Sequence, residues 1–229
     1  MPTLIHSSAL SLVISLLCLA CSHVPVVKNL RVVGTSDIHG YYSVPKAASK
    51  AGGMVRLGAF LDAQKQEGRT ILLVDSGDMW SGTLLSDRNR GALGVRLFNL
   101  VGTAAAALGN HEFDYLEKKT GFPNPFRSLK KRIQEAKFPI LAANLVERKT
   151  GKMPAWPGFA KSVIVKRGGF SIGIVGAITP ETPTITFPVV GKHLRFLDPA
   201  PAIREEATRL MRSKKVDFVI VVAHIGGKC

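Results

Sequence analysis

Four short apolar runs, each followed at once by a polar loop, constrain the fold of this chain more than any other feature. The runs are rich in β-branched or small apolar side chains, as is typical of buried strands. They comprise residues 30–33, 70–74, 103–108 and 216–223. Segments of helical periodicity lie between them at residues 54–66 and 92–100. Strands that alternate with helices predict layered α/β architecture.

The polar loops should lie together, because loops at the carboxyl ends of neighbouring strands share one edge of an open α/β sheet. A further strand is predicted over residues 139–144. Residues 161–166 and 170–178 flank Arg167-Gly168-Gly169, which predicts a hairpin and therefore a mixed sheet. A helix is predicted over residues 202–213, leading into the last strand.

The first two loops carry side chains that suit a metal ion. Asp37-Ile38-His39 places a carboxylate and an imidazole two residues apart, where both can reach one cation. This pattern is weak alone, and Asp37 capping a turn is the plain alternative. Asp78 follows the second run, and its two carboxylate oxygens can bridge cations held about 3.5–4 Å apart.

The third loop, Gly109-Asn110-His111-Glu112-Phe113-Asp114, is more specific. It gathers an amide, an imidazole and two carboxylates, whereas a helix cap needs only one such side chain. His224 follows the fourth run. A lone histidine is most often structural, but its position at a strand end favours a functional reading.

Taken in order, these motifs resemble the calcineurin-like metallophosphoesterase superfamily, and most closely its bacterial 5'-nucleotidase and UDP-sugar hydrolase branch. The segments that carry the closer resemblance are Thr35-Ser36-Asp37-Ile38-His39-Gly40, Asn99-Leu100-Val101-Gly102 and the loop from Gly109 to Asp114. The resemblance implies a layered sandwich with mixed β-sheets flanked by helices. The family's closing Gly-His-x-His element has no counterpart before Cys229, so we expect this fold to be incomplete at the C-terminus. A small natural variant with incomplete metal binding is the alternative.

The resemblance also implies a role for each residue and two divalent metal ions, with Mn, Zn, Fe or Co as candidates. Asp37 and His39 would bind the first ion, Asn110 and His224 the second, and Asp78 both. His111 and Asp114 would form a catalytic dyad, and Glu112 would support the ligands from behind.

The implied reaction is hydrolysis of small phosphate esters, most of all nucleotides, by a metal-activated hydroxide. A catalytically impaired exported metal- or anion-binding lipoprotein remains an alternative. So does a nuclease or thiosulfohydrolase relative on the same fold.

The N-terminus predicts export. Residues 9–20 are almost wholly apolar, but at 1.5 Å per residue this run is too short to cross a bilayer core of about 30 Å. We expect residues 1–21 to be a signal peptide, residues 22–29 a linker and residues 30–229 the catalytic domain. Ala20-Cys21 resembles a lipobox, which predicts lipidation of Cys21 and attachment to a membrane in the periplasm or at the outer membrane. An ordinary cleaved signal or a retained anchor are the alternatives.

The chain is strongly basic, with a net charge of +15 from 31 Lys and Arg against 16 Asp and Glu. Such a field attracts phosphates, nucleic acids or anionic membranes. The clusters Lys130-Lys131-Arg132 and Lys214-Lys215 lack interleaved aromatic residues, which favours solvated helix faces over a nucleic-acid site. The resemblance implies a small phosphate ester, most of all a nucleotide, as the partner, and we predict neither nucleic acid nor a protein partner.

Overall fold

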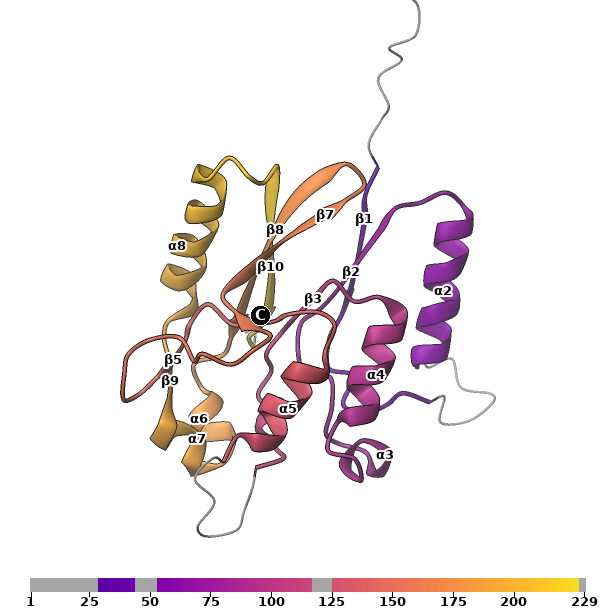
Figure 1. The fold of residues 1–229 in the computed structure, drawn as a ribbon. Helices are drawn as coiled ribbons and strands as arrows, with labels where there is room; N and C mark the ends of the chain where they lie inside the picture. The colour runs from indigo at the N-terminus through magenta and orange to yellow at the C-terminus, as the bar shows by residue number, and fades with distance from the viewer. Residues whose placement is uncertain (1–28, 44–52, 117–124, 227–229) are drawn as a thin grey trace, which may run out of the picture.

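The computed structural model describes residues 29–43, 53–116 and 125–226 (Figure 1). Its larger sheet has five strands in the order β1-β2-β3-β4-β6, and each neighbouring pair is parallel. The strands are β1 (Arg31–Thr35), β2 (Ile71–Asp75), β3 (Ala105–Ala107), β4 (Ile140–Leu141) and β6 (Phe159–Ala160).

A second sheet of three strands has the order β10-β8-β7. Its strands are β7 (Ser162–Arg167), β8 (Phe170–Ile178) and β10 (Phe218–His224). Strands β7 and β8 form the predicted hairpin, and β10 lies parallel to β8. Gly168 and Gly169 form the hairpin turn with φ of 61° and 77°, a region that L side chains rarely adopt. A small third sheet pairs β5 (Leu145–Glu147) with β9 (Leu194–Phe196) in antiparallel fashion.

Helices cover the outer faces of the two larger sheets (Figure 1). Helices α2 (Met54–Gln66), α4 (Ala92–Val101) and α5 (Arg127–Glu135) pack against the five-stranded sheet through one hydrophobic cluster. Helix α8 (Pro199–Arg212) packs against the three-stranded sheet through Ile203, Ala207 and Leu210. The other helices in the described part of the chain are short. They are α3 (Leu84–Asp87), η1 (His111–Phe113), α6 (Thr182–Ile185) and α7 (Pro188–His193).

The inner faces of the two larger sheets pack directly on each other. Ala105 and Ala107 point toward the second sheet, whereas Ala106 points toward the helices, as the alternation of a strand requires. A Cβ at Gly176 would lie 2.3 Å from Cβ of Leu141, so only glycine allows the two sheets this close approach. The result is a four-layer α/β/β/α sandwich.

The predicted fold class is confirmed, as are the four runs, the two early helices and the hairpin. Helix α8 begins three residues earlier than predicted, where the Asp198 carboxylate accepts a hydrogen bond from the Ala200 amide at 2.9 Å. The strand predicted over residues 139–144 contains only β4, Ile140–Leu141. No helix among the described residues is long and apolar enough to span a bilayer. The predicted signal peptide and Cys21 lie outside the described residues.

Two expectations are wrong in detail. The three-stranded sheet is mixed as predicted, but the strands are divided between two sheets instead of lying in one: β1, β2 and β3 lie in the first sheet and β10 in the second. The polar loops therefore converge because two stacked sheets end at the same side, not because four strands are neighbours. The basic cluster on α5 is not a fully solvated face either, because Arg132 is buried.

Candidate metal centre

The loops after β1 and β2 are joined by backbone hydrogen bonds that set the floor of the site. The Asp37 amide donates to the Gly77 carbonyl at 3.1 Å, and the His39 amide donates to the Asp78 carbonyl at 2.9 Å. Asp37, His39 and Asp78 have φ of 53°, 47° and 57°, the left-handed region that non-glycine residues seldom adopt. Such backbone strain concentrates at functional sites, because the surrounding structure must hold it in place.

The Asp78 carboxylate occupies the centre of the converging loops. Its Oδ2 lies 3.1 Å from Nε2 of His224 and 3.5 Å from Nε2 of His39, and its side chain is only 3 % exposed. Its Oδ1 accepts a hydrogen bond from the His111 amide at 2.9 Å. One carboxylate therefore contacts residues from three other loops.

Asp78 belongs to two groups of side chains that are close enough to hold a cation. One group is His39, Asp78 and His111, and the other is Asp37, Asp78 and His224. Within each group the ligand atoms lie within 4.8 Å of one another. The oxygen and imidazole donors suit hard or borderline divalent cations, and neither group includes a thiolate. The residues present therefore fit divalent metal binding.

His224 reaches this centre from the second sheet. Its Nδ1 lies 3.1 Å from the Ser76 carbonyl, which can only accept, so Nδ1 carries a proton and Nε2 faces the site. Nε2 lies 3.0 Å from Oδ1 of Asn110. An outward Nδ1–H bonded to a backbone carbonyl is the arrangement that orients metal-binding histidines.

The pKa values of His224 and Asp78 reflect their contact. Burial by itself would lower the pKa of His224, but the hydrogen bond to Asp78 and its charge outweigh burial and raise that pKa to about 9. Burial would raise the pKa of Asp78, but His224 and the His111 amide outweigh it and lower that pKa. The contact between His224 and Asp78 therefore favours the charged form of each side chain.

His111 and Asp114 form a hydrogen-bonded pair beside the centre. Nδ1 of His111 donates to Oδ2 of Asp114 at 2.7 Å, and the Ser81 hydroxyl donates to the same oxygen at 2.5 Å. The rings of His111 and His39 lie edge to face with centroids 4.7 Å apart. The His111 side chain is 40 % exposed, so a ligand in solution can reach it.

Glu112 supports the site from beneath. Its side chain is buried, with Oε2 accepting from the amides of Asp78 at 2.9 Å and Gly109 at 2.6 Å, and Oε1 from the Met79 amide at 2.8 Å. Burial and the charge of Asp78 raise the pKa of Glu112 to about 8 against the opposing effect of these amides. Glu112 therefore fixes the backbone on which Asp78 stands.

The structure brings together all seven residues that the sequence singled out around the centre. These are Asp37, His39, Asp78, Asn110, His111, Asp114 and His224. Their roles as ligands or catalytic groups stay predictions. The geometric groups place Asp37 with His224, and His39 with His111, whereas the sequence paired Asp37 with His39.

Sequence reasoning missed Ser76 and Ser81. Ser76 contributes only its backbone carbonyl, which a residue of any type would supply, so no sequence signal marks it. Ser81 contributes a hydroxyl, but no spacing in the sequence relates it to Asp114, thirty-three residues away.

The model of the calcineurin-like phosphoesterase family matches residues 30–228. An apyrase of Tabanus yao is 34% identical over 206 residues, covering 86% of this chain and 34% of the apyrase. A 5'-nucleotidase of Diplobatis ommata is 31% identical over 223 residues, covering 94% of this chain and 37% of that protein. The structure of a 5'-nucleotidase precursor from Thermus thermophilus superposes with a TM-score of 0.72 at 28% identity, over 85% of this chain and 37% of that one.

The chain spans about a third of the length of these curated relatives. The family match nevertheless covers the whole region that contains the converging loops, from β1 to β10. The chain therefore belongs to the calcineurin-like phosphoesterase family.

Proposed function

We propose that this chain catalyses the metal-dependent hydrolysis of small phosphate esters, with nucleotides as the main substrate class. The observation that carries the proposal is the position of Asp78, which is shared by two candidate ligand groups. A shared carboxylate is what a pair of cations requires. The apyrase and 5'-nucleotidase among the relatives support nucleotides as the substrate.

In this proposal Asp37 and His39, whose Oδ1 and Nε2 atoms lie 3.8 Å apart, would hold the first cation. Asn110 and His224 would hold the second, and Asp78 would contribute its carboxylate to both. When bound, two such cations lower the pKa of a coordinated water toward about 7 and neutralise the charge of the phosphoryl group. We propose Mn, Zn, Fe or Co, because the donors mix carboxylate, amide and imidazole.

His111 is the proposed proton donor to the leaving group. Asp114 holds its Nδ1 at 2.7 Å, which directs Nε2 away from the carboxylate. The imidazole is exposed enough to meet a substrate, and histidine is the side chain that most often transfers protons in general acid–base catalysis. Ser81 fixes Asp114 and so fixes the orientation of the ring.

The test compares hydrolysis of AMP and of an aryl phosphate by the chain with Mn²⁺ and after chelation. We expect activity that needs the metal and falls at least about a hundredfold in Asp78→Asn, in line with the loss of one charge-stabilising group. Asp62→Asn is the matched control, because Asp62 is exposed on α2 and undergoes the same chemical change.

Activity that survives both chelation and Asp78→Asn would refute the proposal, as would the absence of hydrolysis under all conditions. Cleavage of DNA without cleavage of any nucleotide would favour a nuclease. Binding of Mn²⁺ without turnover would favour the catalytically impaired alternative.

We also propose that the protein is exported and lipid-anchored through Cys21, with residues 30–229 as the catalytic domain. The support is the apolar run at residues 9–20 followed by Ala20-Cys21. In bacterial cells that express the gene, labelled palmitate should be incorporated into the wild-type chain and not into Cys21→Ser. Equal labelling of both would exclude this anchor.

A further inference from the structure

A pocket apart from the metal centre lies between α5 and the turn that joins α3 to α4. Its volume is about 450 Å³. Five of its seven lining residues are cationic. Among the described residues that line it, there is no Asp or Glu. The lining residues are Arg88, Asn89, Arg90, Arg127, Ser128, Lys131 and Arg132. We call it the arginine pocket.

Arg132 is a buried residue that lines the arginine pocket. The residue is 6 % exposed, and its Nη1 donates to the Asn89 carbonyl at 3.0 Å while Nη2 donates to Glu135 at 3.0 Å. Its Nε–H has no hydrogen-bond acceptor within the described part of the chain. A buried donor without an acceptor is costly, and because Arg132 lines the pocket, an anion held there would offset part of that cost through its charge.

Other cations near Arg132 add positive charge to the pocket. Burial lowers the pKa of Arg132, Glu135 opposes that shift, and Arg96 and Arg90 add to it as like charges. Arg90 also donates to the Ser128 hydroxyl at 3.3 Å, which joins the α3–α4 turn to α5 across the pocket. Gathering several cations in one place is unfavourable unless an anion offsets their repulsion.

The N-terminus of α5 adds to the same requirement. Arg127 and Ser128 are the first two residues of this nine-residue helix. Its N-cap residue, Phe126, makes no side-chain capping hydrogen bond, and the first turn of the helix contains no acidic residue. A helix N-terminus favours negative charge, so Arg127 there is unfavourable in isolation and favourable once an anion binds.

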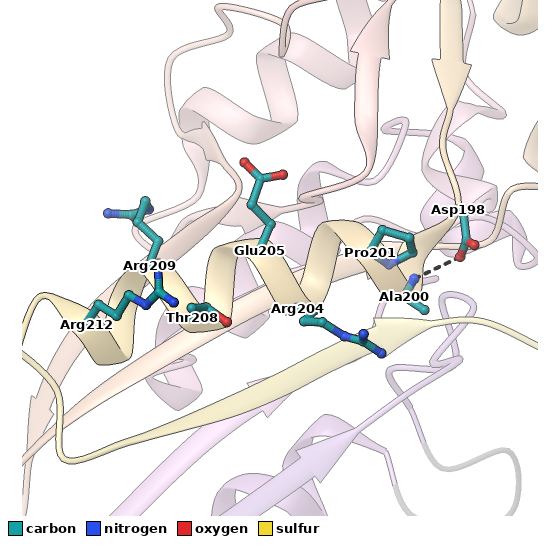
Figure 2. Close-up of a pocket in the computed structure, with 8 residues that line it drawn as sticks. All are labelled: Asp198, Ala200, Pro201, Arg204, Glu205, Thr208, Arg209 and Arg212. Carbon is teal, nitrogen blue, oxygen red and sulfur yellow. Dashed lines mark hydrogen bonds between the residues drawn. The ribbon is translucent and has the colours of Figure 1, made fainter.

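A larger pocket on α8 is a weaker candidate for an anion (Figure 2). It measures about 750 Å³, and its lining residues come from α8 and the capping Asp198 alone. It contains Arg204, Arg209 and Arg212, but the Asp198 and Glu205 carboxylates lie among them. Arg209 is also paired with Glu206 at 2.6 Å. Its cationic charge is therefore partly cancelled.

We propose that the arginine pocket binds a small phosphate oxyanion at a site separate from the metal centre. The anion accepts from the guanidinium groups that line the pocket and balances the cations around it. The phosphate group of a lipid headgroup or of a polynucleotide shares this chemistry. A pocket of about 450 Å³ has room for a free phosphate, which is the occupant that we propose.

The test is calorimetric titration of the full chain with inorganic phosphate at constant ionic strength, with chelator present and in both the wild-type and Asp78→Asn backgrounds. Removing the metal and Asp78 separates this site from the metal centre. We expect one phosphate per chain in both backgrounds. Arg127→Gln combined with Lys131→Gln should weaken binding at least about tenfold. Both residues are exposed, so the variant should fold.

Arg204→Gln combined with Arg212→Gln on α8 is the matched control, with the same change in net charge, and should bind phosphate within about twofold of the wild type. Equal losses in both double variants, or no phosphate binding to the wild type, would overturn the proposal. Binding to phosphatidylglycerol vesicles or to a DNA duplex, with none to inorganic phosphate, would overturn it as well.

Discussion

Replacing Gly109 with alanine should displace the Asp78 carboxylate from the metal centre, because the added methyl group has no room beside it. A Cβ at this position would lie 2.1 Å from Oδ1 of Asp78, 2.4 Å from the Asp78 amide nitrogen and 2.6 Å from Oε2 of Glu112. Ordinary contacts of a Cβ lie at 3.4–4 Å. The Asp78 backbone or the Gly109 loop must therefore move by about 1 Å, whereas metal–ligand distances tolerate only about 0.2 Å.

We expect Gly109→Ala to lose about a hundredfold or more in metal-dependent hydrolysis, because a misplacement of about 1 Å has that cost. Overpacking of this kind should also lower the free energy of unfolding by about 1–3 kcal/mol. The assays are Mn²⁺ titration, hydrolysis of AMP and urea denaturation. Gly34→Ala is the control, since a Cβ there meets nothing within 4 Å although β1 leads to the same site.

The reasoning is refuted if Gly109→Ala binds Mn²⁺ and hydrolyses AMP within twofold of the wild type. It is also refuted if Gly34→Ala is impaired to the same degree, because the effect would then not depend on the contact with Asp78.

Three further substitutions test the supporting contacts. Glu112→Gln replaces one acceptor oxygen by a donor, so one of three backbone amides loses its hydrogen-bond partner. Urea denaturation should then show a free energy of unfolding lower by about 1–3 kcal/mol. A change under about 0.5 kcal/mol would contradict this role of Glu112. Ser81→Ala frees Asp114 and should lower kcat about tenfold with KM nearly unchanged, whereas a change in KM alone would argue against a positioning role. The hydrogen bond from Arg209 lowers the pKa of Glu206, although burial opposes it. The resulting stabilisation is therefore complete above the ordinary value of 4.5 and is lost as pH falls through the lower folded pKa. Denaturation across this range should show the gap between wild type and Glu206→Gln closing toward acid, and a constant gap would refute it.

The sequence predicted which side chains lie together, because each of them stands in a recognisable local pattern. Each polar loop directly follows an apolar run, and the loop from Gly109 to Asp114 holds more chemistry than a cap needs. The central position of Asp78 was harder to see, because its local sequence is only Gly-Asp. Its importance comes from contacts with His39, His111 and His224, which depend on tertiary packing.

The two-sheet arrangement could not be predicted from periodicity. The pattern of a strand indicates which side chains share a face, but not which strand lies beside it. The division between the sheets depends on close approaches such as Gly176 against Leu141. Arg132 was missed for a related reason: a basic triplet on a helix is usually solvated, and only the packing of α5 against the α3–α4 turn buries this one.

The most direct test of the central claim is anomalous X-ray diffraction from crystals of the chain grown with Mn²⁺. We predict two anomalous peaks about 3.5–4 Å apart, one on each side of the Asp78 carboxylate, with His39 beside one and His224 beside the other. A single peak remote from Asp78, or no peak among these residues at saturating Mn²⁺, would contradict the account.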